Sequence, residues 1–176
     1  REVDLIGSAS KRWYIFYLRP KAEKAVRNEL VKRGYEVYCP TCRAVRVWKN
    51  RQKKLIELPL FPNYLFVYTH LHELYAIKCL PKVVSYIASD GRPSVISERE
   101  IDGIRRMVGL EEQITVEAKF CKGQHVRIIS GPLTGYEGIL TRSNGKARFG
   151  IGLKAIDQTV FVDIDVSAIE IIDKEL

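Results

Sequence analysis

The chain has 176 residues, of which 46% are hydrophobic and 28% are charged, a composition typical of one or two globular domains and not of a disordered or fibrous chain. No apolar run approaches the roughly 20 residues that cross a bilayer, and the first residues lack a secretory pattern, so we expect a cytoplasmic protein without a membrane partner. The net charge of +8 comes entirely from the residues up to Leu110, where 21 Lys and Arg stand against 11 Asp and Glu, so we expect any polyanionic partner to meet this part.

The first predicted elements are a strand over 11–18, a helix that begins after Pro20 and a second strand over 35–38. The strand is rich in aromatic and β-branched residues. In the helix, apolar residues recur at helical spacing, cations occupy the opposite face, and Gly34 follows as a C-terminal stop.

A run of cations without acids occupies residues 43–54, interleaved with valines and Trp48. The pattern predicts a two-stranded projection that turns near Asn50 and Arg51. A solvated hairpin tip usually explains such a run, but unbalanced cations repel one another and an aromatic ring among them can stack on a base. We therefore expect contact with nucleic acid. The residues expected to make it are Arg43, Arg46, Lys49, Arg51, Lys53 and Lys54.

Two prolines bracket Leu60 and Phe61 within the stretch 59–68. Each proline fixes its own φ and biases the preceding residue to extended backbone, so we expect a stiff corner that presents both apolar side chains outward. In the strand that follows, aromatic side chains alternate with aliphatic ones, which makes both faces apolar. Such a strand is either buried on both sides or docks a partner with one face, and the residues alone leave both readings open.

Three further elements complete an α+β domain over 11–109 with a largely antiparallel sheet and flanking helices. They are a short helix over 71–79, a strand over 82–87 and a helix that ends near Gly109. The last helix opens with a capping box, in which Ser97 and the residue three positions later exchange hydrogen bonds. Its side chains expected to face the core are Ile101, Ile104, Met107 and Val108.

The remaining residues divide into a short linker and a β segment. Residues 110–119 carry no strong helix or strand period, and we interpret them as a linker or an arm. Residues 120–173 predict five short strands with an Asn-Gly hairpin turn at 144–145, which suggests a small barrel. Gly150 and Gly152 fit the bends that closure requires. From Glu111 onward 8 Lys and Arg stand against 10 Asp and Glu, so this part has a slight negative charge. We therefore do not expect RNA binding to be the barrel's main function.

Two motifs resemble those of a known family. Residues 131–138, with the sequence Gly-Pro-Leu-Thr-Gly-Tyr-Glu-Gly, resemble a KOW motif. A first strand with Trp13 and Tyr14, a basic helix, a Phe-Pro-x-Tyr core within 60–67 and this C-terminal motif together resemble the NusG family of transcription elongation factors. The Pro-Leu pair before that core and the Asn inside it look more like the specialised paralogues that antiterminate particular operons, capsule-locus antiterminators among them.

The resemblance implies a non-catalytic monomer without a cofactor, built from a NusG N-terminal type domain and an SH3-like KOW barrel. It implies that an apolar aromatic surface docks on the clamp helices of RNA polymerase. This docking would hold the basic projection over 43–54, together with Arg19, Lys21 and Lys24, near the non-template DNA strand. The barrel is implied to tether a ribosomal protein or a Rho-type factor, through contacts that we assign to Leu133 and Tyr136. For Tyr136 the sequence leaves two alternatives open, an exposed aromatic contact or a core residue. Carried over to this sequence, the docking positions are Trp13, Tyr14, Leu60, Phe61 and Tyr64, with Val84, Ser85 and Tyr86 at the rim.

Two other function classes remain open. The first is a ribosome-associated KOW protein that binds RNA. The second is a thiol or zinc enzyme centred on Cys39 and Cys42, which form a C-x-x-C pair. Zinc would need two further ligands, and the candidates, which show no second close pair, are His70, His72, Cys79, Cys121 and His125. No Ser-His-Asp order, nucleotide loop or paired catalytic carboxylates stand out, so we expect neither a metal nor an enzyme.

Overall fold

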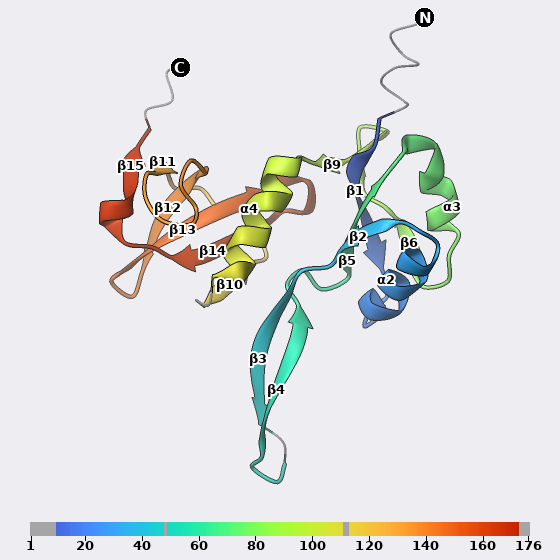
Figure 1. The fold of residues 1–176 in the computed structure, drawn as a ribbon, viewed down its shortest axis with the longest axis horizontal. Coiled ribbons are helices and arrows are strands. Elements are labelled where there is room, and N and C mark those ends of the chain that lie inside the picture. Colours follow the sequence, from blue (N-terminus) through green and yellow to red (C-terminus); the bar gives the residue numbers. More distant parts are fainter. Residues whose placement is uncertain (1–9, 48, 111–112, 173–176) are drawn as a thin grey trace, which may run out of the picture. The chain divides into compact units, whose positions relative to one another are not determined.

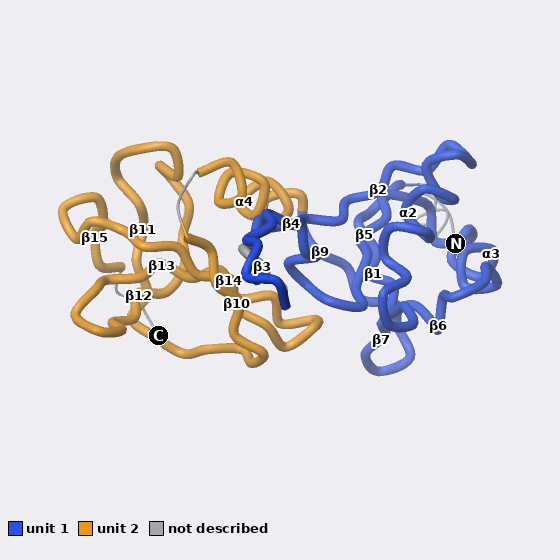
Figure 2. Tube along the Cα trace, turned by 90° about the horizontal axis from the view of Figure 1, so that it is seen from below, with its two compact units in different colours: residues 1–97 blue, residues 98–176 orange. Residues whose placement is uncertain are grey.

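The computed structural model describes residues 10–47, 49–110 and 113–172, and the chain divides into two compact units (Figures 1 and 2). Unit 1 comprises residues 1–97 and unit 2 comprises residues 98–176, which Figure 2 colours blue and orange. Unit 1 combines a sheet with helices, and unit 2 combines one α-helix with a six-stranded sheet among the described residues. The predicted α+β class is confirmed.

Unit 1 contains an antiparallel sheet, a two-stranded arm and three short helical segments within the described residues. Each strand and helix that the sequence predicts in this part is present. In chain order the elements are β1 (Arg12–Leu18), α2 (Glu23–Lys32), β2 (Glu36–Tyr38), β3 (Thr41–Val47), β4 (Lys53–Pro59), β5 (Tyr64–Thr69), η1 (Leu71–Glu73), α3 (Leu74–Lys78), β6 (Val83–Tyr86), β7 (Ala88–Ser89), β8 (Arg92–Pro93) and β9 (Val95–Ile96).

The main sheet of unit 1 has the strand order β2-β5-β1-β6, with β9 also paired to β1. Helices α2 and α3 both pack on one face of this sheet, where alternate residues of β1 and β5 meet the apolar stripes of the helices. Fully burying one such side chain contributes about 1.5–3 kcal/mol, so this layer holds the unit together. The buried cluster consists of Tyr14, Phe16, Leu18, Ala22, Val26, Leu30, Leu65, Val67, Leu74 and Ile77.

The arm consists of β3 and β4, which pair only with each other, from Thr41 opposite Pro59 to Val47 opposite Lys53. Figure 1 shows it extending away from the main sheet of unit 1. At its tip Arg51 has a left-handed backbone with φ of 64°, and the amide of Gln52 donates to Asn50 Oδ1 at 3.1 Å. The predicted projection and its turn are therefore confirmed.

Unit 2 contains the helix that the sequence predicts after Ser97, followed by an antiparallel sheet with the order β10-β14-β13-β12-β11-β15. The buried side chains of this sheet form a core of their own around Phe149. We call the sheet the barrel. In chain order the elements are α4 (Glu98–Gly109), β10 (Ile114–Glu117), β11 (Gln124–Ile128), β12 (Glu137–Ser143), β13 (Lys146–Leu153), η2 (Lys154–Ile156), β14 (Gln158–Asp163), η3 (Val166–Ala168) and β15 (Ile169–Ile171).

Strand β10 corrects the prediction of a linker over 110–119. Its residues pair with β14, from Ile114 opposite Val162 to Glu117 opposite Thr159. The four residues do alternate apolar with polar, but so short a pattern becomes a strand only because β14 offers a free edge. The division of the chain also differs from the predicted domain over 11–109, because α4 groups with unit 2. Residues 111–112 of the expected linker lie outside the described residues.

Two glycines of the barrel make room for aromatic rings. A Cβ on Gly150 would lie 2.5 Å from the ring of Phe161, and a Cβ on Gly152 would lie 2.4 Å from the ring of Phe120. Real carbon atoms do not approach so closely, so both rings could pack only over a residue without a side chain. The sequence predicts bends at these two positions. The contacts give a different reason for glycine there, which is the close packing of an aromatic ring over each one.

Candidate partner-binding surfaces

An aromatic face lies on the side of the unit 1 sheet opposite α2 and α3. Directly opposite residues of paired strands share a face, and the register of β1 and β5 brings aromatic side chains together there. The rings of Trp13 and Tyr68 have centroids 5.3 Å apart, and those of Tyr17 and Tyr64 are 5.4 Å apart. The aromatic face consists of Trp13, Ile15, Tyr17, Tyr38, Tyr64, Phe66 and Tyr68.

The predicted corner at Leu60 and Phe61 turns inward. In the full chain Leu60 is 4% exposed and Phe61 is 1% exposed. The Phe61 ring packs edge-on against Phe66, with 5.8 Å between the ring centroids. The expectation that Phe61 protrudes is therefore wrong.

The backbone of Asn63 explains this inward turn. Asn63 has a left-handed conformation with φ of 71°, and its amide donates to Glu23 Oε1 at 2.8 Å. Its carbonyl accepts a hydrogen bond from the amide of Leu18 at 2.7 Å. Both partners lie at the junction of β1 and α2, far away in the sequence. The prolines fix their own φ angles, but these distant hydrogen bonds decide which way the corner faces.

Trp13 and Tyr14 cannot share a docking surface, because neighbours in a strand point to opposite faces. Trp13 lies on the aromatic face and is 3% exposed in the full chain. Tyr14 belongs to the cluster beneath α2 and α3, where burial raises the pKa of its phenol although Arg12 opposes the shift. Tyr86 packs against the same cluster. The prediction that Tyr14 and Tyr86 join Trp13 on one surface is therefore wrong.

The most exposed residue of the aromatic face, Tyr17, belongs to a short row across three strands. Tyr17 is 37% exposed and lies between Tyr64 of β5 and Ser85 of β6, both of which are half-buried. The pKa of Tyr64 is raised, mainly by burial and further by Tyr17, so its phenol stays neutral at physiological pH. Val84 is exposed on the neighbouring position of β6. We call Tyr17, Tyr64 and Ser85 the tyrosine row.

Tyr17 is the residue that the sequence interpretation missed. Its signal is the alternation of Trp13, Ile15 and Tyr17 along β1, which puts all three on one face. The family motif assigns only Trp13 and Tyr14 of the predicted strand as docking positions. Exposure at the end of the strand depends on what lies beside it, which the alternation cannot show.

The arm exposes most of the cations assigned to nucleic-acid contact. The residues concerned are Arg43, Lys49, Arg51, Lys53 and Lys54. Arg46 lies opposite Lys54 in the ladder, and Trp48, expected to stack on bases, lies outside the described residues. At the tip, three of these lysines line an open hollow of about 880 Å³ together with Asn50 and Gln52. Val47 and Leu55 are 61% and 58% exposed among the charges, which gives the arm both cationic and apolar contact area.

Three further predicted contacts, Arg19, Lys21 and Lys24, are exposed near the root of the arm. They follow β1 or lie in the first turn of α2. The hydrogen bonds of Asn63 to Glu23 and Leu18 link this region to the corner that follows β4.

The glycine turn of unit 2, residues 131–138, hides both of its assigned contact residues. Leu133 is 3% exposed and Tyr136 is 8% exposed. The Tyr136 hydroxyl donates a hydrogen bond to Asp102 Oδ2 on α4. Of the two alternatives for Tyr136, an exposed contact or a core residue, the structure shows the buried one, because α4 covers it.

Two arginines of α4 complete the cover over Tyr136. The guanidinium carbons of Arg99 and Arg106 lie 5.1 Å and 5.2 Å from the centre of its ring, within the range of cation–π attraction. Burial raises the pKa of the Tyr136 phenol, and the hydrogen bond to Asp102 raises it further. The same hydrogen bond is the main cause of a lowered pKa at Asp102, and Arg106 adds to it.

The cysteines and histidines form no metal centre in the described part of the chain. No group of three or more His, Cys, Asp and Glu side chains is placed there to hold a metal ion. Cys39 and Cys42 are free thiols, and burial is the main cause of a raised pKa at Cys39. A raised pKa reduces the thiolate fraction, the opposite of what a catalytic cysteine needs. His70 and His72 stack on each other with centroids 5.3 Å apart.

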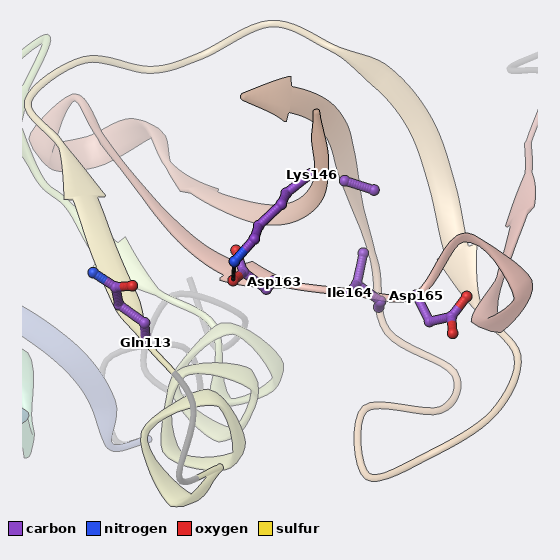
Figure 3. A pocket seen from close by; sticks show the side chains of 6 residues that line it. Gln113, Lys146, Asp163, Ile164 and Asp165 are labelled. Atoms are coloured by element: carbon purple, nitrogen blue, oxygen red, sulfur yellow. Dashed lines mark ion pairs between the residues drawn. The ribbon is translucent and has the colours of Figure 1, made fainter. Parts of the chain in front are cut away.

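A shallow hollow of about 450 Å³ lies beside the end of β14 (Figure 3). Its charged groups bind one another or the backbone: Lys146 Nζ lies 3.9 Å from Asp163 Oδ2, and Asp165 accepts from the amide of Ser167 at 3.0 Å. These internal pairs argue against a binding site for a small molecule. Among the described helices, none is long and apolar enough to cross a membrane.

Comparison with known proteins places this architecture in one family. The family model described as transcription termination factor nusG matches residues 11–105, which is more than half of the chain. The transcription termination/antitermination protein NusG of Pseudomonas aeruginosa is 27% identical, over 92% of this chain and 98% of its own. The corresponding protein of Thermus thermophilus is 25% identical, over 77% and 84%.

A solved structure shows the same relationship. The structure of NusG from Thermotoga maritima has a TM-score of 0.53 and 25% identity, and the match covers 95% of this chain and 100% of that one. The family match spans β1 through most of α4, and the structural match adds the barrel. The chain belongs to the NusG family of non-catalytic transcription termination and antitermination factors.

Proposed function

We propose that this NusG-family protein binds the clamp helices of RNA polymerase with its tyrosine row, holds DNA with its arm and tethers another protein through unit 2. The observation that carries the proposal is the tyrosine row on a sheet face that neither helix of unit 1 covers. The chain would act in the cytoplasm, where bacterial RNA polymerase works. That it is an operon-specific paralogue remains a prediction.

The tyrosine row has the chemistry of a protein-docking surface. Tyrosines dominate interface energetics because a rigid ring buries much apolar area while its hydroxyl still finds a hydrogen-bond partner. Tyr17 is accessible, and Tyr64 and Ser85 extend the row to both sides. Trp13 and Phe61 would support this row from the buried part of the same face, where Phe61 packs against Phe66, and Leu60 precedes Phe61 as a further buried residue. Two packed helices, as in a clamp, offer the groove into which such a row fits.

The arm has the chemistry of a nucleic-acid contact. Up to Ser97 the chain has 18 Lys and Arg against 8 Asp and Glu, and five of the arm's cations are exposed. Their attraction to phosphates is independent of sequence and sensitive to salt, and the exposed Val47 and Leu55 add apolar contact with bases or sugars. A chain docked on the polymerase would bring these groups to the non-template strand.

Unit 2 is suited to proteins more than to nucleic acid. From Glu98 onward it has 11 Lys and Arg against 13 Asp and Glu, which disfavours a phosphate backbone. We propose that it tethers a ribosomal protein or a Rho-type factor through the glycine turn. A ribosome-associated RNA-binding role would need a basic surface on this unit, so the charge favours tethering.

The proposal is tested by binding of the full chain to purified RNA polymerase, followed by transcription of a template with a strong pause site. We expect a complex that survives gel filtration and a shorter pause. A chain that co-sediments with ribosomes and leaves the polymerase unbound would instead support the ribosome-associated alternative. Failure to bind polymerase would overturn the docking proposal.

A further inference from the structure

We propose that Glu23 is a positioning residue for polymerase docking: from the α2 side of the sheet, its side-chain oxygen holds the turn that carries Tyr64 into the tyrosine row. This inference rests on the docking role proposed above for that row. The groups concerned all lie among the described residues of unit 1.

Three turns of the same kind meet at the end of the unit 1 sheet that borders the tyrosine row. They span residues 19–22, 61–64 and 80–83, and each has proline at its second position. In each turn the fourth amide donates to the first carbonyl, at 3.2, 3.1 and 3.3 Å, and the third residue has a positive φ. These are the features of a type II turn, whose third position suits Gly or Asn. Here the third residues are Lys21, Asn63 and Lys82.

Backbone hydrogen bonds join the turns to one another through the end of β1. The amide of Leu18 donates to the carbonyl of Asn63 at 2.7 Å, and the amide of Arg19 donates to the carbonyl of Lys82 at 3.0 Å. The tyrosine row lies directly before these two donors along β1. The geometry of the turns therefore determines how the row is presented to a partner.

The turn over 61–64 differs from the other two because no helix adjoins it. The turn over 19–22 leads into α2, and the turn over 80–83 follows α3. The turn over 61–64 is entered from the arm, whose strands pair only with each other. Its entry is tied to the base of the arm by the amide of Leu60, which donates to the carbonyl of Pro40 at 2.8 Å. This turn therefore depends on support from outside its own segment.

Glu23 supplies that support from the first turn of α2. Its Oε1 accepts a hydrogen bond from the amide of Asn63 at 2.8 Å, and the residue is 7% exposed in the full chain. A buried carboxylate is costly unless it is hydrogen-bonded, and a charged acceptor makes a stronger bond than a neutral one. The start of a helix also favours a negative charge. After burial, this charge is the next cause of the raised pKa of Cys39, so Glu23 also lies near the base of the arm.

The bond to Glu23 selects one of two conformations that the proline allows. Proline at the second position fits both a type I and a type II turn, which differ by reversal of the central peptide. The type II form directs the amide of Asn63 to Glu23, and the reversed peptide would turn it away. The type I form would relieve Asn63 of its left-handed backbone. Without the acceptor both forms would be populated, and a partner that binds Tyr64 would have to order the turn again.

The test compares two neutral residues of similar size at position 23 of the full chain. Glu23→Gln keeps a side-chain oxygen that can accept the amide of Asn63, whereas Glu23→Leu keeps the volume and loses the acceptor. Both remove one negative charge, so the difference between them isolates the hydrogen bond. Glu29→Leu is the control, because Glu29 lies on the same helix in an exposed ion pair with Arg33 at 2.9 Å.

The first readout needs no polymerase. Hydrogen exchange of the amides of Asn63 and Tyr64 reports on the turn, since the first donates to Glu23 and the second to the carbonyl of Phe61. We expect Glu23→Leu to exchange both amides about tenfold faster than the parent chain, and Glu23→Gln and Glu29→Leu to stay within about twofold. Equal exchange in Glu23→Leu and Glu23→Gln overturns the proposal.

The second readout is binding to purified RNA polymerase. We expect Glu23→Leu to raise the dissociation constant about tenfold, and Glu23→Gln and Glu29→Leu to leave it unchanged. Adding Asn63→Gly to Glu23→Leu should restore binding, because glycine holds a type II turn without an acceptor. Asn63→Gly alone is the matched control and should bind as the parent chain does.

Urea denaturation of the same variants separates positioning from stability. If Glu23→Leu lowers the free energy of unfolding without weakening binding, or if Asn63→Gly does not restore binding, Glu23 is merely structural and the proposal is wrong. If the parent chain itself does not bind polymerase, the docking proposal fails, and the exchange readout still decides whether Glu23 holds the turn.

Discussion

Tyr17 lies directly opposite Tyr64 in the antiparallel pairing of β1 and β5, and their rings meet edge to face at 5.4 Å. Each tyrosine therefore holds the other in place at the accessible end of the aromatic face. A ring that is already ordered loses little conformational entropy when a partner covers it, which favours tight binding.

The first prediction concerns these two rings. We expect Tyr17→Ala and Tyr64→Ala each to weaken binding to RNA polymerase by about 30-fold, since truncating an aromatic anchor costs about 2 kcal/mol. Titration of labelled polymerase with each variant measures the effect. Tyr75→Ala is the control, because Tyr75 is 74% exposed on α3. Equal losses for all three variants would place the interface elsewhere.

The second prediction separates the two roles open to Phe61. The ring is 1% exposed, so Phe61→Ala should lower the free energy of unfolding by about 3–5 kcal/mol, as truncation of a buried ring does. Urea denaturation measures this change. A Phe61→Ala chain that keeps its stability but no longer binds polymerase would show that the ring faces the partner, as the sequence motif suggests.

The third prediction concerns the arm. Replacing both Lys53 and Lys54 by Ala should weaken binding to a single-stranded oligonucleotide and reduce the slope of log K against log salt by about 0.7 for each lost phosphate contact. Fluorescence anisotropy at several salt concentrations gives both quantities. The exposed Lys154 of unit 2 provides the control, and Lys154→Ala should leave the slope unchanged. An unaltered slope in the double variant would exclude the arm from DNA contact.

The fourth prediction concerns pH. The hydrogen bond from Tyr136, followed by Arg106, lowers the pKa of Asp102 in the folded chain. A lowered folded-state pKa stabilises the α4 contact above the ordinary carboxyl pKa, near pH 4, and this contribution is lost as the pH falls through the lowered value. In an NMR titration, Tyr136→Phe should move the Asp102 midpoint upward. Identical midpoints would mean that the hydroxyl does not hold Asp102 in solution.

The fifth prediction tests the thiol enzyme alternative. Burial raises the pKa of Cys39, so iodoacetamide at neutral pH should label the exposed Cys79 before Cys39. Mass spectrometry after short labelling times gives the order. Cys39→Ser should retain polymerase binding, whereas rapid labelling of Cys39 and loss of function in this variant would revive the enzymatic interpretation.

Local chemistry in the sequence was sufficient to predict the arm and the sheet. A run of cations around a turn, the aromatic and β-branched residues of β1 and the aromatic residues at every second position of β5 describe structure that neighbouring residues determine. The combination of the Phe-Pro-x-Tyr core with the other motifs also predicted the NusG family, whose model matches residues 11–105.

What could not be predicted depends on contacts between distant residues. The corner faces inward because Asn63 bonds to Glu23 and Leu18, and Tyr136 is buried because α4 supplies Asp102. Strand β10 shows its alternation in only four residues and needs β14 as a partner. In each case the local pattern permits several outcomes, and tertiary hydrogen bonds select one of them.

The position of α4 determines where a recombinant C-terminal fragment of this protein should begin. Its sequence falls largely within the matched N-terminal region, yet its contacts group it with the barrel. A recombinant fragment that starts after Leu110 would leave the Tyr136 ring and the side of Ile151 open to water, and could capture proteins that the intact chain excludes. Interaction screens should therefore use a C-terminal piece that begins at Glu98.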